Sequence, residues 1–66
     1  MNKEEMADYL RTQIELYHTI ALDESNRDVY RIRCYGMARG FQMTLAMLTG
    51  EIVDIKPIDA YGELIR

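Results

Sequence analysis

The stretch from Val29 to Leu48 constrains the fold more than any other, because it has the pattern of one helix with two separate apolar faces. At 100° per residue, apolar side chains on a helix gather into stripes. The first stripe contains Tyr30, Cys34, Met37, Phe41, Leu45 and Leu48. The second contains Val29, Ile32, Gly36, Gly40, Met43 and Met47. A helix in a two-helix hairpin needs one stripe for its core. The second stripe therefore predicts contact with another subunit, a partner protein or a ligand.

The length of the chain makes self-association the expected source of extra stability. A chain of 66 residues forms a single small domain, and such a domain buries only roughly 60% of the surface that its unfolded chain exposes. Folds of this size usually need disulfides, a metal or oligomerisation. The sequence has one cysteine, Cys34, and one histidine, His18, so it predicts no intrachain disulfide, no zinc site and no cofactor. A homo-oligomer is the remaining expectation.

A first helix is predicted from Asn2 to about Leu22. Asn2 is a favourable N-cap residue, and Glu5 follows it with the spacing of a capping box. The apolar side chains of this helix recur on one face, which consists of Ala7, Leu10, Ile14, Tyr17 and Ala21. That face predicts the side of the helix that enters the core.

The boundaries of the second helix follow from turn and capping residues. The polar run 23–28 is typical of a turn, with Ser25 as the expected N-cap residue, and Gly50 is the expected left-handed C-cap residue. A connection this short makes the two helices antiparallel neighbours. Tyr17, Tyr30 and Cys34 are expected in the core between them.

The residues after Gly50 predict an extended arm. Residues 51–58 are rich in β-branched side chains and are interrupted by Pro57. Since one strand is not stable alone, the arm is expected to pack along the helices or to pair with a copy from another subunit. Asp59 is a candidate cap for a final helical turn. The predicted fold is thus all-α, an antiparallel two-helix hairpin of residues 1–50 with an extended C-terminal arm of residues 51–66, assembled as a helical homo-oligomer.

Two glycines identify the expected subunit interface. Gly36 and Gly40 lie four residues apart on the second apolar face, and each glycine inside a helix costs about 1 kcal/mol relative to alanine. The pair favours close approach of another helix, or room for a ligand. Arg33 lies at the edge of this face and is a candidate for an interface ion pair. The predicted oligomer interface consists of Val29, Ile32, Arg33, Gly36, Gly40, Met43 and Met47.

A polar stripe between the two apolar faces is the candidate site for a partner or ligand. It carries Arg31, Tyr35 and Arg39 at spacings of four residues, with Gln42 beside them. The planar guanidinium of arginine suits carboxylate or phosphate recognition. The plainer interpretation is a solvated stripe that pairs with carboxylates of the first helix.

The sequence favours a binding function over an enzymatic one. No phosphate-binding loop, nucleophile elbow or metal motif is present, so no enzyme is predicted. The N-terminal sequence is not that of a secretory signal, and no apolar run is long enough to cross a membrane, so a cytoplasmic location is expected. The favoured hypothesis is an oligomeric protein-interaction module, a regulator or inhibitor that binds another protein.

Two alternatives remain open. The first is a nucleic-acid-binding regulator that uses Arg27, Arg31, Arg33 and Arg39; the net charge of −3 opposes it. The second is a small-anion sequestering protein that uses Arg31, Tyr35 and Arg39.

Overall fold

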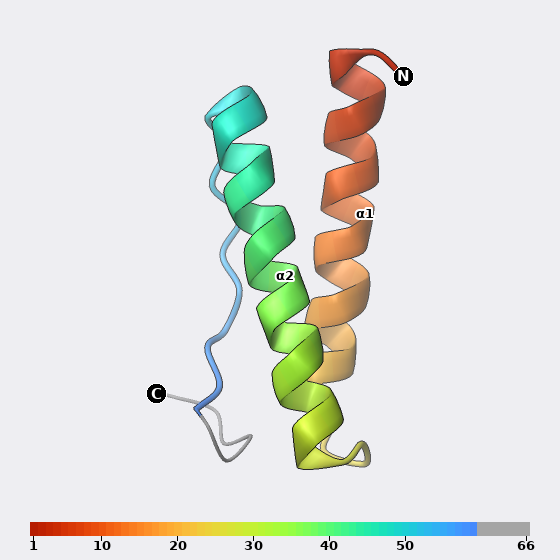
Figure 1. The fold of residues 1–66 in the computed structure, drawn as a ribbon, viewed down its shortest axis with the longest axis vertical. Coiled ribbons are helices and arrows are strands. Elements are labelled where there is room, and N and C mark those ends of the chain that lie inside the picture. The colour runs from red at the N-terminus through yellow and green to blue at the C-terminus, as the bar shows by residue number, and fades with distance from the viewer. Residues whose placement is uncertain (60–66) are drawn as a thin grey trace.

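The computed structural model describes residues 1–59 and consists of two antiparallel helices followed by an extended arm (Figure 1). Helix α1 spans Lys3–Leu22 and helix α2 spans Asp28–Thr49. The arm, residues 51–59, runs back beside the hairpin toward its loop end and contains no strand. The all-α hairpin is confirmed, while the homo-oligomer stays a prediction. The expected final helical turn lies outside the described residues.

Both helices have one end that the sequence predicts correctly. The Glu5 backbone N–H donates to Asn2 Oδ1 at 2.8 Å, so Asn2 caps the start of α1. At the end of α2, Gly50 adopts the left-handed conformation with φ 78°, and its N–H donates to the Ala46 carbonyl at 2.8 Å. These bonds satisfy backbone groups that a helix end otherwise leaves open.

The start of α2 differs from the prediction that Ser25 caps it. The N-cap position belongs to Arg27, which makes no side-chain capping bond. Ser25 is instead bonded within the turn, since its N–H and its hydroxyl both donate to Asp23 Oδ1, at 3.0 and 2.7 Å. Asp23 thereby closes an Asx-type turn and engages the hydroxyl that was expected to cap the helix.

The core consists of two clusters, and the arm contributes to both. In the first cluster, Ala7, Leu10 and Ile14 of α1 meet Leu45 of α2, with Val53 and Ile55 of the arm packed against them. In the second cluster, Ala21 and Cys34 meet Ile58 of the arm. Tyr17 and Phe41 stack at a centroid distance of 5.8 Å. Of the two arrangements expected for the arm, packing along the helices is the one observed for residues 51–59.

The buried face of α2 is rotated relative to the prediction. Its buried residues are Arg31, Cys34, Ala38 and Leu45. Tyr30 and Met37, both expected in the core stripe, are 47% and 39% exposed. On this rotated face α2 packs against α1, and the arm packs against both helices along the groove between them.

Candidate interaction surface

Most of the predicted interface lies on the side of α2 that faces away from the core. Val29, Met43 and Met47 are 71%, 59% and 87% exposed, and Arg33 is exposed beside them. We call this surface the outer face of α2, defined by Val29, Arg33, Gly36, Gly40, Met43 and Met47. Ile32 does not belong to it: contrary to the prediction, Ile32 is half-buried against the cluster of Ala21, Cys34 and Ile58.

The two glycines of the outer face have no neighbour within the described chain that requires them. A Cβ atom added at Gly36 or at Gly40 would meet nothing within 4 Å. Neither glycine has a positive φ, so neither is explained by its backbone conformation. The packing of the described hairpin therefore offers no compensation for the helix stability that these glycines cost.

Arg31 is not on a solvated stripe, which corrects the prediction. It is 7% exposed, and its Nε donates to the carbonyl oxygen of Ala21 at 2.8 Å. Its Nη1 lies 3.8 Å from Asp28 Oδ1 on the same helix, so its partners are not α1 carboxylates. The Ala21 carbonyl is in the last turn of α1, where carbonyls lack intrahelical partners and a cation is favourable. Arg31 thus acts as a side-chain cap for α1.

The other residues of the predicted stripe point to different surroundings. Gln42 donates through Nε2 to the Val53 carbonyl of the arm. Tyr35 is half-buried against the second core cluster. Arg39 is exposed, and it forms no ion pair with any residue in the range 1–59. The structure therefore does not bring Arg31, Tyr35, Arg39 and Gln42 together into one site.

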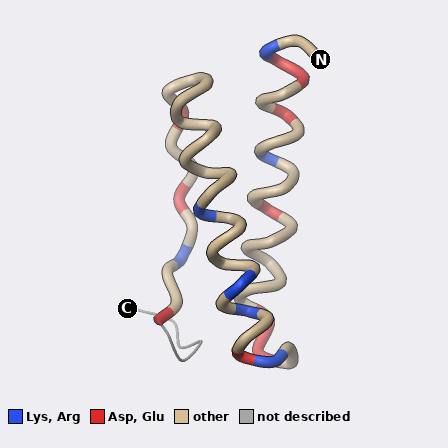
Figure 2. The backbone as a smooth tube through the Cα atoms, in the orientation of Figure 1, with Lys and Arg blue, Asp and Glu red and all other residues tan. Residues whose placement is uncertain are grey.

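The charged side chains are distributed unevenly over the hairpin. Figure 2 shows basic residues gathered near the loop end of α2 and acidic residues spread along α1. Arg27 and Arg33 are exposed at that end of α2. Arg33 forms no ion pair with another described residue. The ion pair predicted for it across a subunit interface stays a prediction.

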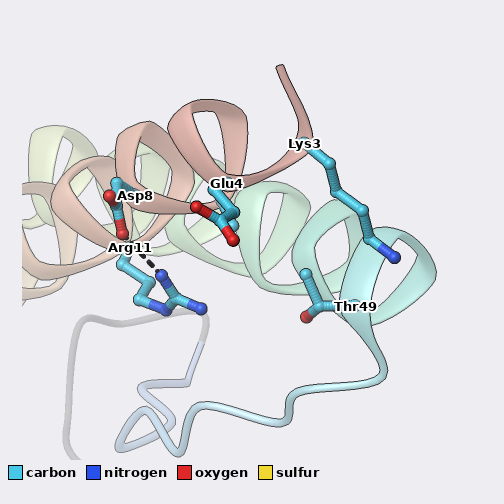
Figure 3. A pocket seen from close by; sticks show the side chains of 6 residues that line it. Lys3, Glu4, Asp8, Arg11 and Thr49 are labelled. Atoms are coloured by element: carbon cyan, nitrogen blue, oxygen red, sulfur yellow. Dashed lines mark hydrogen bonds and ion pairs between the residues drawn. The ribbon is translucent and has the colours of Figure 1, made fainter.

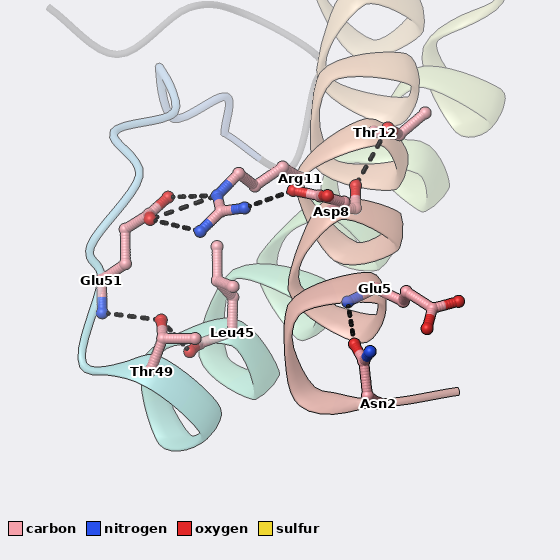
Figure 4. A network of polar contacts seen from close by, with 8 residues as sticks. All are labelled: Asn2, Glu5, Asp8, Arg11, Thr12, Leu45, Thr49 and Glu51. Atoms are coloured by element: carbon pink, nitrogen blue, oxygen red, sulfur yellow. Dashed lines mark hydrogen bonds and ion pairs between the residues drawn. The ribbon is translucent and has the colours of Figure 1, made fainter.

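A salt bridge that the sequence analysis missed joins α1 to the start of the arm (Figure 4). Arg11 Nε lies 2.9 Å from Glu51 Oε2, and Arg11 Nη2 lies 2.8 Å from Glu51 Oε1. Arg11 Nη1 also donates to Asp8 Oδ1 at 2.7 Å. The hydrogen bonds from Arg11 lower the pKa of Glu51. Because 40 positions separate Arg11 from Glu51, no local sequence pattern indicates this pair.

A shallow depression of about 470 Å³ lies next to this salt bridge (Figure 3). Its charged lining mixes both signs, with Lys3 and Arg11 beside Glu4 and Asp8. Arg11 is already engaged by two carboxylates. The depression therefore has no charge preference that would select a ligand.

His18 connects α1 to the middle of the arm. The Lys56 backbone N–H donates to His18 Nε2 at 2.9 Å, so that nitrogen accepts and the imidazole is neutral. Partial burial lowers the pKa of His18, with the nearby charge of Lys56 acting in the same direction. The contact gives His18 a structural role, since it fixes the arm against α1.

Comparison with protein families, with curated proteins and with solved structures finds no match to this chain. Within residues 1–59, no group of three or more potential metal ligands comes together. Neither described helix is long and apolar enough to cross a membrane.

Proposed function

We propose that this chain is a small protein-interaction module and that the outer face of α2 is its binding surface. The observation that carries the proposal is the exposure of Val29, Met43 and Met47 around the bare backbone of Gly36 and Gly40. An apolar stripe exposed along the full length of a helix is unfavourable in water and is typical of a binding surface. Because Gly36 and Gly40 carry no Cβ atom, a partner helix could approach the backbone of α2 closely on this face.

The first partner we propose for this face is a second copy of the chain. The outer-face residues lie at equal distances on either side of Ala38, which pairs Gly36 with Gly40, Arg33 with Met43 and Val29 with Met47. Two antiparallel copies of α2 that cross on the outer face, between Gly36 and Gly40, would bring these pairs together. Such a contact uses the same patch on both subunits, as a two-fold symmetric dimer requires.

The same surface supports the hypothesis of a regulator or inhibitor that binds another protein. Arg33 and Arg39 border the apolar stripe on opposite sides at helical spacing, and both are exposed. They favour partner helices that carry carboxylates beside an apolar ridge. The lone buried Cys34 is compatible with the cytoplasmic location expected for such a protein.

The two alternative functions have less support. Both the nucleic-acid and the small-anion hypotheses used Arg31, which is buried and bonded to Ala21. The net charge of −3 also opposes the counterion release that drives binding to nucleic acid.

The proposal is tested by sedimentation equilibrium of the intact chain at micromolar concentration. We expect a mass above the 7.7 kDa of one chain, and we expect Met47→Glu to reduce it. Ile52→Glu is the matched control, because Ile52 is 79% exposed but lies on the arm. A parent chain that remains a monomer would contradict the self-association, and equal effects of the two variants would remove the outer face as the interface.

A further inference from the structure

The arm lies across the hairpin as a strap that is held at three polar points. Glu51 pairs with Arg11, the Val53 carbonyl accepts from Gln42, and the Lys56 N–H donates to His18. Two of these contacts are made to the arm's backbone by side chains from different helices. Because these two bonds are made to backbone atoms, they do not depend on which side chains stand at positions 53 and 56.

The strap covers apolar surface that would otherwise meet water. Ile58 is buried and closes the cluster of Ala21 and Cys34, whose side chains are 0% and 1% exposed. Val53 and Ile55 cover the cluster around Ile14 and Leu45 in the same way. Lifting residues 53–58 would expose this groove between α1 and α2, including the Cys34 thiol.

His18 is the point at which the strap is sensitive to acid. Its Nε2 accepts the Lys56 N–H, and a protonated imidazole carries a hydrogen on both nitrogens, so two donors would then face each other. The charged groups around His18 are Arg11 and Glu15 from α1 and Asp54 and Lys56 from the arm. Helix α2 contributes no residue to the lining of this groove of about 320 Å³.

We propose that residues 53–58 form an acid-sensitive strap, in which protonation of His18 releases the arm and uncovers the apolar groove between α1 and α2. This inference does not depend on the outer face of α2, which lies on the other side of that helix.

The direction of the effect follows from linkage. Burial in the closed state lowers the pKa of His18, and the Nε2 lone pair that accepts the Lys56 N–H is lost when the ring is protonated. The released state therefore binds a proton more readily than the closed state does. The fraction of molecules with a released strap is therefore smallest above the ordinary histidine pKa of about 6.5. This fraction increases as the pH falls through the lower pKa that His18 has in the closed state. The hydrogen bonds from Arg11 lower the pKa of Glu51, so this carboxylate stays ionised across that window. The Arg11–Glu51 pair then keeps the start of the arm in place.

The single cysteine provides the readout. The rate at which Cys34 reacts with a dithiodipyridine reagent that works in mild acid is measured at about pH 7.5 and about pH 5.5. Each rate is divided by the rate for the denatured chain at the same pH. We expect the normalised rate to rise several-fold at the lower pH while the far-ultraviolet circular dichroism of the helices is unchanged. Ile58→Ala, the positive control, raises the rate already at the higher pH.

His18→Gln separates the imidazole from other titrating groups, since its amide oxygen accepts the Lys56 N–H at either pH. We expect this variant to lose the acid response. Amide exchange of Lys56 in the unmodified chain gives a second measurement that needs no variant, and the protection of this amide is expected to fall in parallel. Unchanged reactivity and protection between the two pH values would overturn the proposal. So would an acid response that persists in His18→Gln, or loss of helical signal together with the strap.

Discussion

Arg31 Nε donates a hydrogen bond of 2.8 Å to the carbonyl oxygen of Ala21, and this bond joins the first turns of α2 to the last turn of α1. Arg31 is buried, as are Cys34 and Ala38, on the inner face of α2. An arginine in this position replaces the missing partner of a helix-terminal carbonyl. It therefore belongs to the scaffold of the hairpin and is not part of a surface site.

This relationship predicts that Arg31→Ala destabilises the hairpin. Hydrogen bonds from charged groups contribute about 1.5–3 kcal/mol, and the variant also removes the packing of the buried side-chain stem. We expect the midpoint of urea denaturation to fall accordingly. Arg39→Ala is the control, because Arg39 is exposed and surface substitutions usually change stability by less than about 0.5 kcal/mol. Equal midpoints for the two variants would show that the Arg31 bond contributes little.

Alanine at Gly36 or Gly40 should have opposite effects on folding and on assembly. Since a Cβ atom meets nothing within 4 Å at either position, each variant should stabilise the isolated hairpin by about 1 kcal/mol. If partner helices meet at these glycines, the same variants should weaken self-association. Thermal denaturation at low concentration measures the first effect and sedimentation equilibrium measures the second. Association as strong as that of the parent would exclude close helix contact at the glycines.

Gly50→Ala is the contrasting substitution. Gly50 has φ 78° at the C-cap of α2, a conformation that costs an ordinary residue roughly 1–2 kcal/mol. We expect this variant to lower the melting temperature, whereas the alanine variants of the helical glycines raise it. A melting temperature for Gly50→Ala at or above that of the parent would contradict the left-handed cap.

The Arg11–Glu51 pair predicts an acid limit for the start of the arm. The hydrogen bonds from Arg11 lower the pKa of Glu51, so the contribution of this pair is complete above the ordinary glutamate pKa of about 4.3. It is lost as the pH falls through the lower folded value. Titration of the Glu51 carboxyl group by nuclear magnetic resonance should give a pKa below that of a glutamate in an unfolded peptide. In Arg11→Gln the value should return toward ordinary, and a value that does not move would exclude Arg11 as the cause.

The proposed protein-binding role predicts no appreciable affinity for duplex DNA at ~150 mM salt. The net charge of −3 opposes the counterion-release contribution that supplies most non-specific binding. Fluorescence anisotropy with a labelled duplex measures this affinity. Micromolar binding that falls steeply with salt and is lost in an Arg33→Ala, Arg39→Ala double variant would favour the nucleic-acid hypothesis instead.

The sequence by itself determined those features that depend on neighbouring residues. The Asn2 cap, the core face of α1 and the Gly50 cap are all fixed by spacings of a few residues, and such local geometry is the same in any fold that contains the helix. The exception, Ser25, shows the limit of this reasoning, because Asp23 competes for the hydroxyl over an equally short distance.

The tertiary structure decided which side of α2 faces inward and what the polar residues of α2 and the arm contact. A helix with two apolar stripes has no local preference between them, so α1 and the arm together selected the buried face, which contains Ala38 and Arg31. The bonds of Arg11 to Glu51 and of His18 to Lys56 join residues 40 and 38 positions apart. Contacts of that kind exist only after the chain has folded back on itself, and no spacing within a helix encodes them.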